Sequence, residues 1–207
     1  TELNLGSMLL RQDRHEAAAS FYRQAAVRFA RAGDVRHSIM ADIGLAGALT
    51  WLYEFDEAQR LYDRAAMRVR SRQLHDLQGV IDTNRGRLEL HRGHFDAALA
   101  CLDAAMREAE QHGMPHDVAE TRRDLADAYL ALNLLPESIA LYDQTIAACE
   151  ALDAPVERAW AELQRAQALA RSGQPGLAAQ GLGRARELLM AHGSAVGPTL
   201  ADLRLAA

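Results

Sequence analysis

The chain has 207 residues, of which 49% are hydrophobic, and its 23 basic and 28 acidic residues give a formal charge of −5. A chain of this length and composition buries a sizeable core, so a folded protein is expected. The negative charge argues against a general attraction to nucleic acid or to anionic membranes, and no apolar run reaches the roughly 18 residues of a membrane span. We therefore expect neither nucleic acid nor membrane as a partner.

Alanine is the most telling residue type, with 41 copies against only four Phe and two Trp. Alanine favours helices and lets them pack closely, so the composition predicts an all-α fold. The two cysteines, Cys101 and Cys149, lie in helical patterns without a second thiol at metal-ligand spacing. This pattern predicts neither a disulfide nor a zinc site, and it favours a reducing, cytoplasmic location.

Apolar periodicity predicts a succession of helices of similar length. Glycines fall at the expected turns, for example Gly33, Gly93 and Gly113, and all five prolines lie at or just before a predicted helix start, where a missing N–H costs little. The helices predicted in chain order are 15–32, 37–52, 55–72, 76–92, 95–112, 116–132, 135–152, 156–172 and 175–192.

A 40-residue repeat runs through the whole sequence without an insertion. Small and large residues recur in the same register, which is what two helices need in order to interlock as a hairpin. The units are about 1–34, 35–74, 75–114, 115–154 and 155–194, followed by one unpaired helix over 198–207. The clearest columns are Ala18, Ala58, Ala98, Ser138 and Ala178; then Tyr22, Tyr62, Leu102, Tyr142 and Leu182; then Ala25, Ala65, Ala105, Thr145 and Ala185.

The order Phe55, Ala58, Tyr62, Ala65 resembles the second helix of the tetratricopeptide repeat, and the resemblance covers about 200 of the 207 residues. The 40-residue unit is similar to the arrays of kinesin light chain, of multidomain bacterial regulators and of bacterial proteins with a caspase-like CHAT peptidase domain. The resemblance implies a right-handed superhelical solenoid of antiparallel helix pairs that holds a protein or peptide. Because the sequence starts at Thr1 without Met and stops at Ala207 in mid-pattern, we also expect it to be a piece of a larger chain.

Some positions depart from the repeat pattern. Glu89 stands where other units have a large apolar residue, and Pro175 stands in the aromatic column. We expect looser packing in these units, and either capping or fraying for the unpaired helix over 198–207.

The resemblance places ligands on a concave wall formed by the first helix of each unit, here called the first-helix wall. Asn84, Arg87 and His91 would offer an amide, a guanidinium and an imidazole on one helix face, suited to a peptide backbone and an acidic side chain. A solvated polar face without a ligand is the alternative. The candidates for partner binding are Trp51, Asn84, Arg87, His91, Arg123, Asp127, Gln164 and Arg171.

Other candidate sites are weaker. Trp51 and Trp160 are potential partner anchors, although packing between units would use such rings equally well. The pairs His91/His94 and His112/His116 have spacings that suit a metal, yet neither has an obvious third ligand. No nucleophile, base and orienting residue form a recognisable pattern, so we predict no catalysis, cofactor or metal for this chain.

Two functional hypotheses follow. The first is an interaction scaffold that binds a peptide or a partner domain on the first-helix wall. The second is a regulatory segment of a larger signalling protein or CHAT-type peptidase, in which the partner is another domain of the same parent chain. The sequence decides neither the partner nor the oligomeric state.

Overall fold

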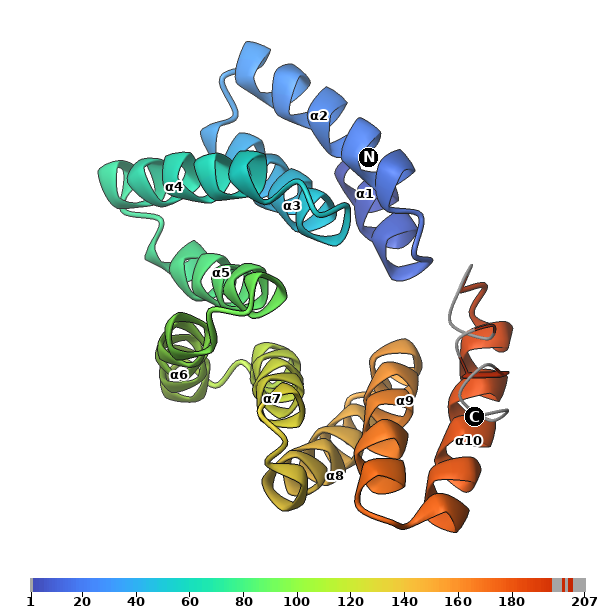
Figure 1. Cartoon of the computed structure of the whole chain (residues 1–207). Helices are drawn as coiled ribbons and strands as arrows, with labels where there is room; N and C mark the ends of the chain where they lie inside the picture. The colour runs from blue at the N-terminus through green and yellow to red at the C-terminus, as the bar shows by residue number, and fades with distance from the viewer. Residues whose placement is uncertain (1, 195–198, 200, 203–207) are drawn as a thin grey trace. The chain divides into compact units, whose positions relative to one another are not determined.

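The computed structural model describes residues 2–194, 199, 201 and 202, and within them ten helices have defined bounds and no residue is in a strand (Figure 1). The predicted all-α solenoid of antiparallel helix pairs is confirmed. Most of the helix predicted over 198–207 lies outside the described residues, as does Pro198. The helices are α1 (Glu2–Arg11), α2 (His15–Arg31), α3 (Val35–Trp51), α4 (Phe55–Arg72), α5 (Gln78–Arg92), α6 (Phe95–Gln111), α7 (Pro115–Ala131), α8 (Leu135–Ala151), α9 (Pro155–Arg171) and α10 (Pro175–Ala191).

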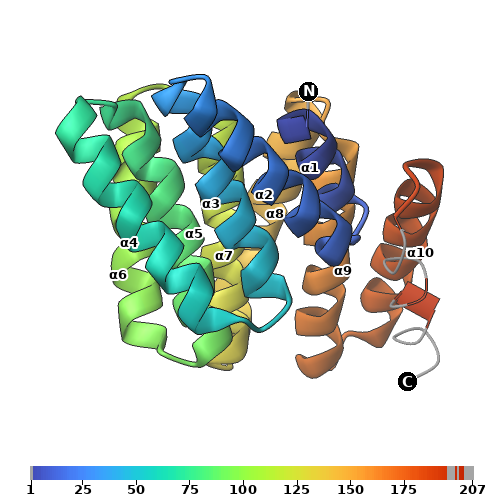
Figure 2. The same cartoon turned by 90° about the horizontal axis from the view of Figure 1, so that it is seen from above.

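The chain divides into two compact parts, residues 1–105 and 106–207, whose border falls within α6. In the N-terminal part each of α1 to α4 packs on the next helix, and the first helices also touch one another, α1 with α3 and α3 with α5. In the C-terminal part α7 to α10 pack in the same succession, and α7 touches α9 (Figures 1 and 2). Each part therefore presents a first-helix wall of its own.

A left-handed residue recurs every 20 residues, one in each turn between helices. The amide one residue further on donates to the carbonyl five residues back, for example Asp34 to Phe29 at 2.9 Å and Gln174 to Leu169 at 2.9 Å. This is the Schellman ending of a helix, which satisfies the last carbonyls. The 40-residue repeat is thus two helices and two such turns. The left-handed residues are Asp13, Gly33, Tyr53, Gln73, Gly93, Gly113, Asn133, Asp153, Gly173 and Gly193.

Helix starts differ from the prediction by up to two residues. α3 begins at Val35 rather than at 37, because the Asp34 carboxylate caps it by accepting a hydrogen bond from the His37 amide at 3.1 Å. α5 begins later than predicted, after a short 3-10 turn over His75–Leu77, and its N-cap residue Leu77 offers no side-chain acceptor. Capping chemistry rather than apolar periodicity sets these boundaries.

The three repeat columns form the core, and each of their members is at most 4% exposed. Tyr22 shows why small residues must face them: a methyl group at Gly6 would lie 2.9 Å from its ring, and one at Gly44 only 2.4 Å. The Tyr22 ring, on α2, is thus wedged between α1 of its own unit and α3 of the next unit. Its hydroxyl lies 2.9 Å from Ser7 Oγ, so its one polar atom is also satisfied.

Ion pairs across neighbouring helices also follow the repeat. Asp42, 3% exposed, accepts from Arg64 at 2.8 Å and from Arg68 at 2.8 Å. Glu162, also 3% exposed, accepts from Arg184 at 2.9 and 3.0 Å. Both acids lie in the first helix of a hairpin and both pairs span 22 residues, so the same buried carboxylate position ties each of these hairpins together.

We predict opposite effects for two Gly→Ala substitutions. Gly44→Ala should destabilise the protein by about 2 kcal/mol, because the new methyl group must displace the buried Tyr22 ring. Gly183→Ala in α10 meets no atom within 4 Å and should stabilise by about 0.5–1 kcal/mol through helix propensity. Urea denaturation followed by circular dichroism measures both, and a Gly44→Ala midpoint equal to that of the unchanged chain would contradict the wedge.

A second prediction contrasts a buried with an exposed carboxylate. Asp42→Ala should cost about 2 kcal/mol, since it removes two charge-assisted hydrogen bonds from a site 3% exposed. Asp63 pairs with Arg85 over the same 22-residue separation, but its side chain is 53% exposed. Asp63→Ala should therefore cost less than about 1 kcal/mol. Equal losses in the same denaturation assay would refute the role given to burial.

Candidate functional site

The N-terminal part brings together four predicted site residues on α3 and α5. Trp51 is the last residue of α3 and remains 39% exposed. Its ring meets His91 of α5 edge-on at 4.9 Å between centroids. Asn84 lies two turns before His91 on the same helix, and Arg87 lies one turn before it. Tertiary packing therefore places a large ring beside the polar face of α5.

The amide of Asn84 is engaged at both ends. Its Nδ2 donates to the Val80 carbonyl at 2.7 Å, and its Oδ1 accepts from Arg87 at 3.3 Å. Asn84 therefore contacts Arg87 directly, and a ligand that used the Asn84 amide would have to displace these two hydrogen bonds.

Aromatic rings form a ladder that connects the ends of α3 and α5 with the starts of α2 and α4. His15 stacks on Trp51 with centroids 5.5 Å apart and planes at 9°. His91 meets both Trp51 and Tyr53, and Tyr53 meets Phe55 at 5.8 Å. Burial lowers the pKa of His15, an effect partly opposed by Asp13, so burial favours the neutral ring. We call these five rings the aromatic ladder.

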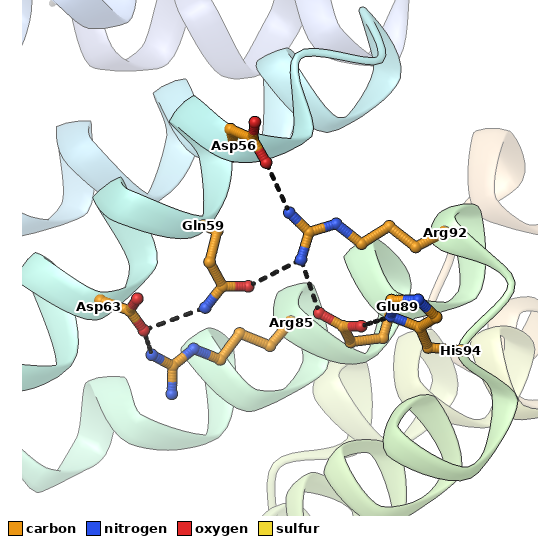
Figure 3. Close-up of polar contacts among 7 residues, drawn as sticks. All are labelled: Asp56, Gln59, Asp63, Arg85, Glu89, Arg92 and His94. Carbon is orange, nitrogen blue, oxygen red and sulfur yellow. Dashed lines mark hydrogen bonds and ion pairs between the residues drawn. The ribbon is translucent and has the colours of Figure 1, made fainter.

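Glu89 anchors a polar network beside the ladder, shown in Figure 3. Its carboxylate lies 3.1 Å from Arg92 and 2.6 Å from His94 Nδ1, and its side chain is only 16% exposed. The network explains how the third unit accommodates a charge in an apolar column. Arg92 also reaches Gln59 at 3.4 Å and Asp56 at 3.5 Å on α4. α4 and α5 are therefore joined by polar contacts at this end.

The C-terminal part holds the other four predicted residues on α7 and α9. Asp127 accepts a hydrogen bond from the buried Tyr142 hydroxyl, and burial first, then Asp127, raises the pKa of Tyr142. Arg171 donates to the Leu130 carbonyl at 3.0 Å and to Asn133 at 2.7 Å. Both side chains thus contribute to holding neighbouring helices together.

The remaining two lie on the same helices, Arg123 one turn before Asp127 and Gln164 two turns before Arg171. Arg123 pairs with Asp124 at 3.2 Å and is half-buried, and Gln164 is half-buried on α9.

The weaker candidates have the following surroundings. Trp160 is partly buried and packs against the core of the C-terminal part. Burial raises the pKa of both thiols, Cys101 and Cys149, which opposes their use as nucleophiles. In residues 2–194, 199, 201 and 202, no three His, Cys, Asp or Glu side chains gather as they would around a metal ion.

Three members of the ladder, His15, Tyr53 and Phe55, were not among the sequence candidates for partner binding. His15 appears in the sequence only as a departure from the aromatic column, and Tyr53 has no column of its own. A signal for Tyr53 did exist: it stands 40 residues before Gly93 and 20 after Gly33, at a register position that needs a left-handed backbone. A bulky residue there is unusual enough to be noticed.

Known proteins share both the repeat pattern of this sequence and its fold. Residues 77–151 match the sequence model of the tetratricopeptide repeat. The crystal structure of BtubC (BKLC) from P. vanneervenii superposes with a TM-score of 0.70 at 19% identity, covering 94% of this chain and 81% of that one. A Podosopora anserina protein, described as a kinesin light chain with nearly identical TPR-like repeats, gives 0.56 at 17% identity, covering 90% and 92%.

No curated protein matches the sequence significantly. Within the described residues, no helix combines the length and the apolar character needed to cross a bilayer. Residues 77–151 match the tetratricopeptide repeat, and the chain shares its solenoid fold with both solved structures.

Proposed function

We propose that this chain is an interaction scaffold that holds a peptide segment or domain of a protein partner on its first-helix wall, centred on Trp51. The observation that carries the proposal is the exposure of Trp51, whose ring is 39% accessible although it stacks on His15 and His91. A rigid ring held in place by its neighbours gives contact area at little entropic cost.

Arg87 gives this anchor a polar companion. Its guanidinium is steered by Asn84, and it extends from the same face of α5 as His91. A partner segment would place an apolar or aromatic side chain on Trp51 and a carbonyl or carboxylate near Arg87. The candidates for a corresponding wall in the C-terminal part are Arg123, Asp127, Gln164 and Arg171.

The regulatory hypothesis is one version of the same role. If the parent chain carries a catalytic domain such as a CHAT-type peptidase, that domain would be the partner held by the wall. Two observations distinguish the regulatory hypothesis from a scaffold for separate proteins. One is the sequence that adjoins this chain, and the other is the activity of the full-length protein with and without the array.

We predict that Trp51→Ala weakens partner binding about 30-fold, as loss of an interface anchor does, and that Arg87→Ala weakens it about tenfold. The partner is first identified by affinity capture and mass spectrometry, then purified and titrated by calorimetry.

Met67→Ala serves as the control, because Met67 is 61% exposed on the second helix α4 rather than on the wall. Its affinity should stay within twofold of the unchanged chain. If Trp51→Ala and Arg87→Ala bind the partner as tightly as this control does, the wall in the N-terminal part is not the binding surface.

A further inference from the structure

Two large apolar side chains of α1 are exposed on a face that the other first helices bury. Leu5 is 41% exposed and Met8 is 46% exposed. Leu45, at the register position of Leu5 in α3, is only 5% exposed, so the same residue type is buried in the second unit and open in the first. The residues at the register position of Met8 are fully buried in every other unit: Ala48, Leu88, Ala128 and Ala168.

The second helix of the preceding unit is what covers this face. α2 packs on α3, α4 on α5 and α8 on α9. At the register position of Leu5, Arg165 of α9 pairs with Asp143 of α8 at 2.6 Å, and Arg85 of α5 pairs with Asp63 of α4. The side chain at this position therefore points toward the preceding second helix.

The covering helix has a recognisable pattern of side chains. In α2 it is a small, a large and a small residue, Ala18, Tyr22 and Ala25, all of them buried. α1 can accept such a helix although it carries the polar residue Asn4. Asn84 stands at the same register position in α5, and α5 nevertheless packs on α4.

A second copy of this chain has little to offer to the open face. Its helices α2, α4 and α8 each pack on the first helix that follows. Its last second helix, α10, is already in contact with the residues after it: Ala201 is fully buried in the core that α10 shares, and Asp202 accepts from Arg186 at 2.6 Å. Those second helices are therefore not available for docking.

The face is also small for a separate protein. α1 has ten residues, which makes it about 15 Å long, and its exposed large apolar residues are Leu5 and Met8. Stable interfaces between separate proteins bury about 800 Å² on each partner, more than two side chains supply. A covalent link raises the effective concentration to about the millimolar range, so a helix of the same polypeptide fills such a face readily.

We infer that the Leu5–Met8 face of α1 receives the second helix of a further hairpin of the same 40-residue type, which precedes α1 in the same polypeptide. This helix carries a small–large–small stripe like that of α2. The inference goes beyond partner binding on the first-helix wall, because it assigns a different face of α1 to the continuation of the array.

Hydrogen exchange followed by mass spectrometry tests the inference on this chain and on the full-length polypeptide that contains it. The amides of residues 6–11 should exchange at least tenfold more slowly in the full-length polypeptide, because its preceding helix covers α1. Leu5→Gln combined with Met8→Gln should remove most of this protection there and change exchange in this chain less than twofold. Leu177→Gln combined with Met190→Gln, on the similarly exposed surface of α10, should leave the protection of α1 unchanged.

Equal exchange of α1 in the two proteins would overturn the inference. So would a full-length sequence without small, large and small residues 40 positions before Ala18, Tyr22 and Ala25. Protection that rises with the concentration of this chain alone would assign the face to a second copy, and protection that requires an added protein would assign it to a separate partner; either result overturns the inference. The first-helix wall has its own test in the titration of Trp51→Ala, so the two proposals fail independently.

Discussion

The structure depends on the interlock between a large residue of each second helix and the small residues of the first helices on either side. Tyr22 illustrates it most directly, since its ring lies where Gly6 and Gly44 leave no room for a methyl group. A helix hairpin alone cannot cover such a ring, because one of the two small residues belongs to the next unit. The interlock therefore makes each unit require its neighbour, which is the physical basis of a solenoid.

Polar contacts complete this interlock and also limit which side chains meet a ligand. The buried tyrosine of α2 and that of α8 bond to Ser7 and Asp127, which occupy the same register position on their first helices. Asp127 thus has a structural role as well as its position on the wall. Arg171 has a similar double character, since it donates to Leu130 and Asn133. Trp51 and His91 stand in the same repeat column as Arg171, and they contact each other through their rings.

The turn at Tyr53 carries an aromatic residue at its left-handed position, where the other described turns carry Gly, Asp, Asn or Gln. The repeat requires a left-handed residue at this point, and glycine or asparagine would meet the requirement at lower strain. The tyrosine instead extends the aromatic ladder to the acidic start of α4.

The sequence by itself determined the helix pairs, the 40-residue period and the three core columns, because small-large periodicity and turn spacing are local properties that survive without coordinates. It also predicted that Asn84, Arg87 and His91 share one helix face and that Trp51 lies on the same wall. Only the tertiary structure decided that Trp160 packs against a core and that His15 stacks on Trp51, 36 positions away on another helix. Asn84 bonds within α5, where Val80 and Arg87 are two of several neighbours within reach. No local pattern specifies which pairs of side chains come into contact.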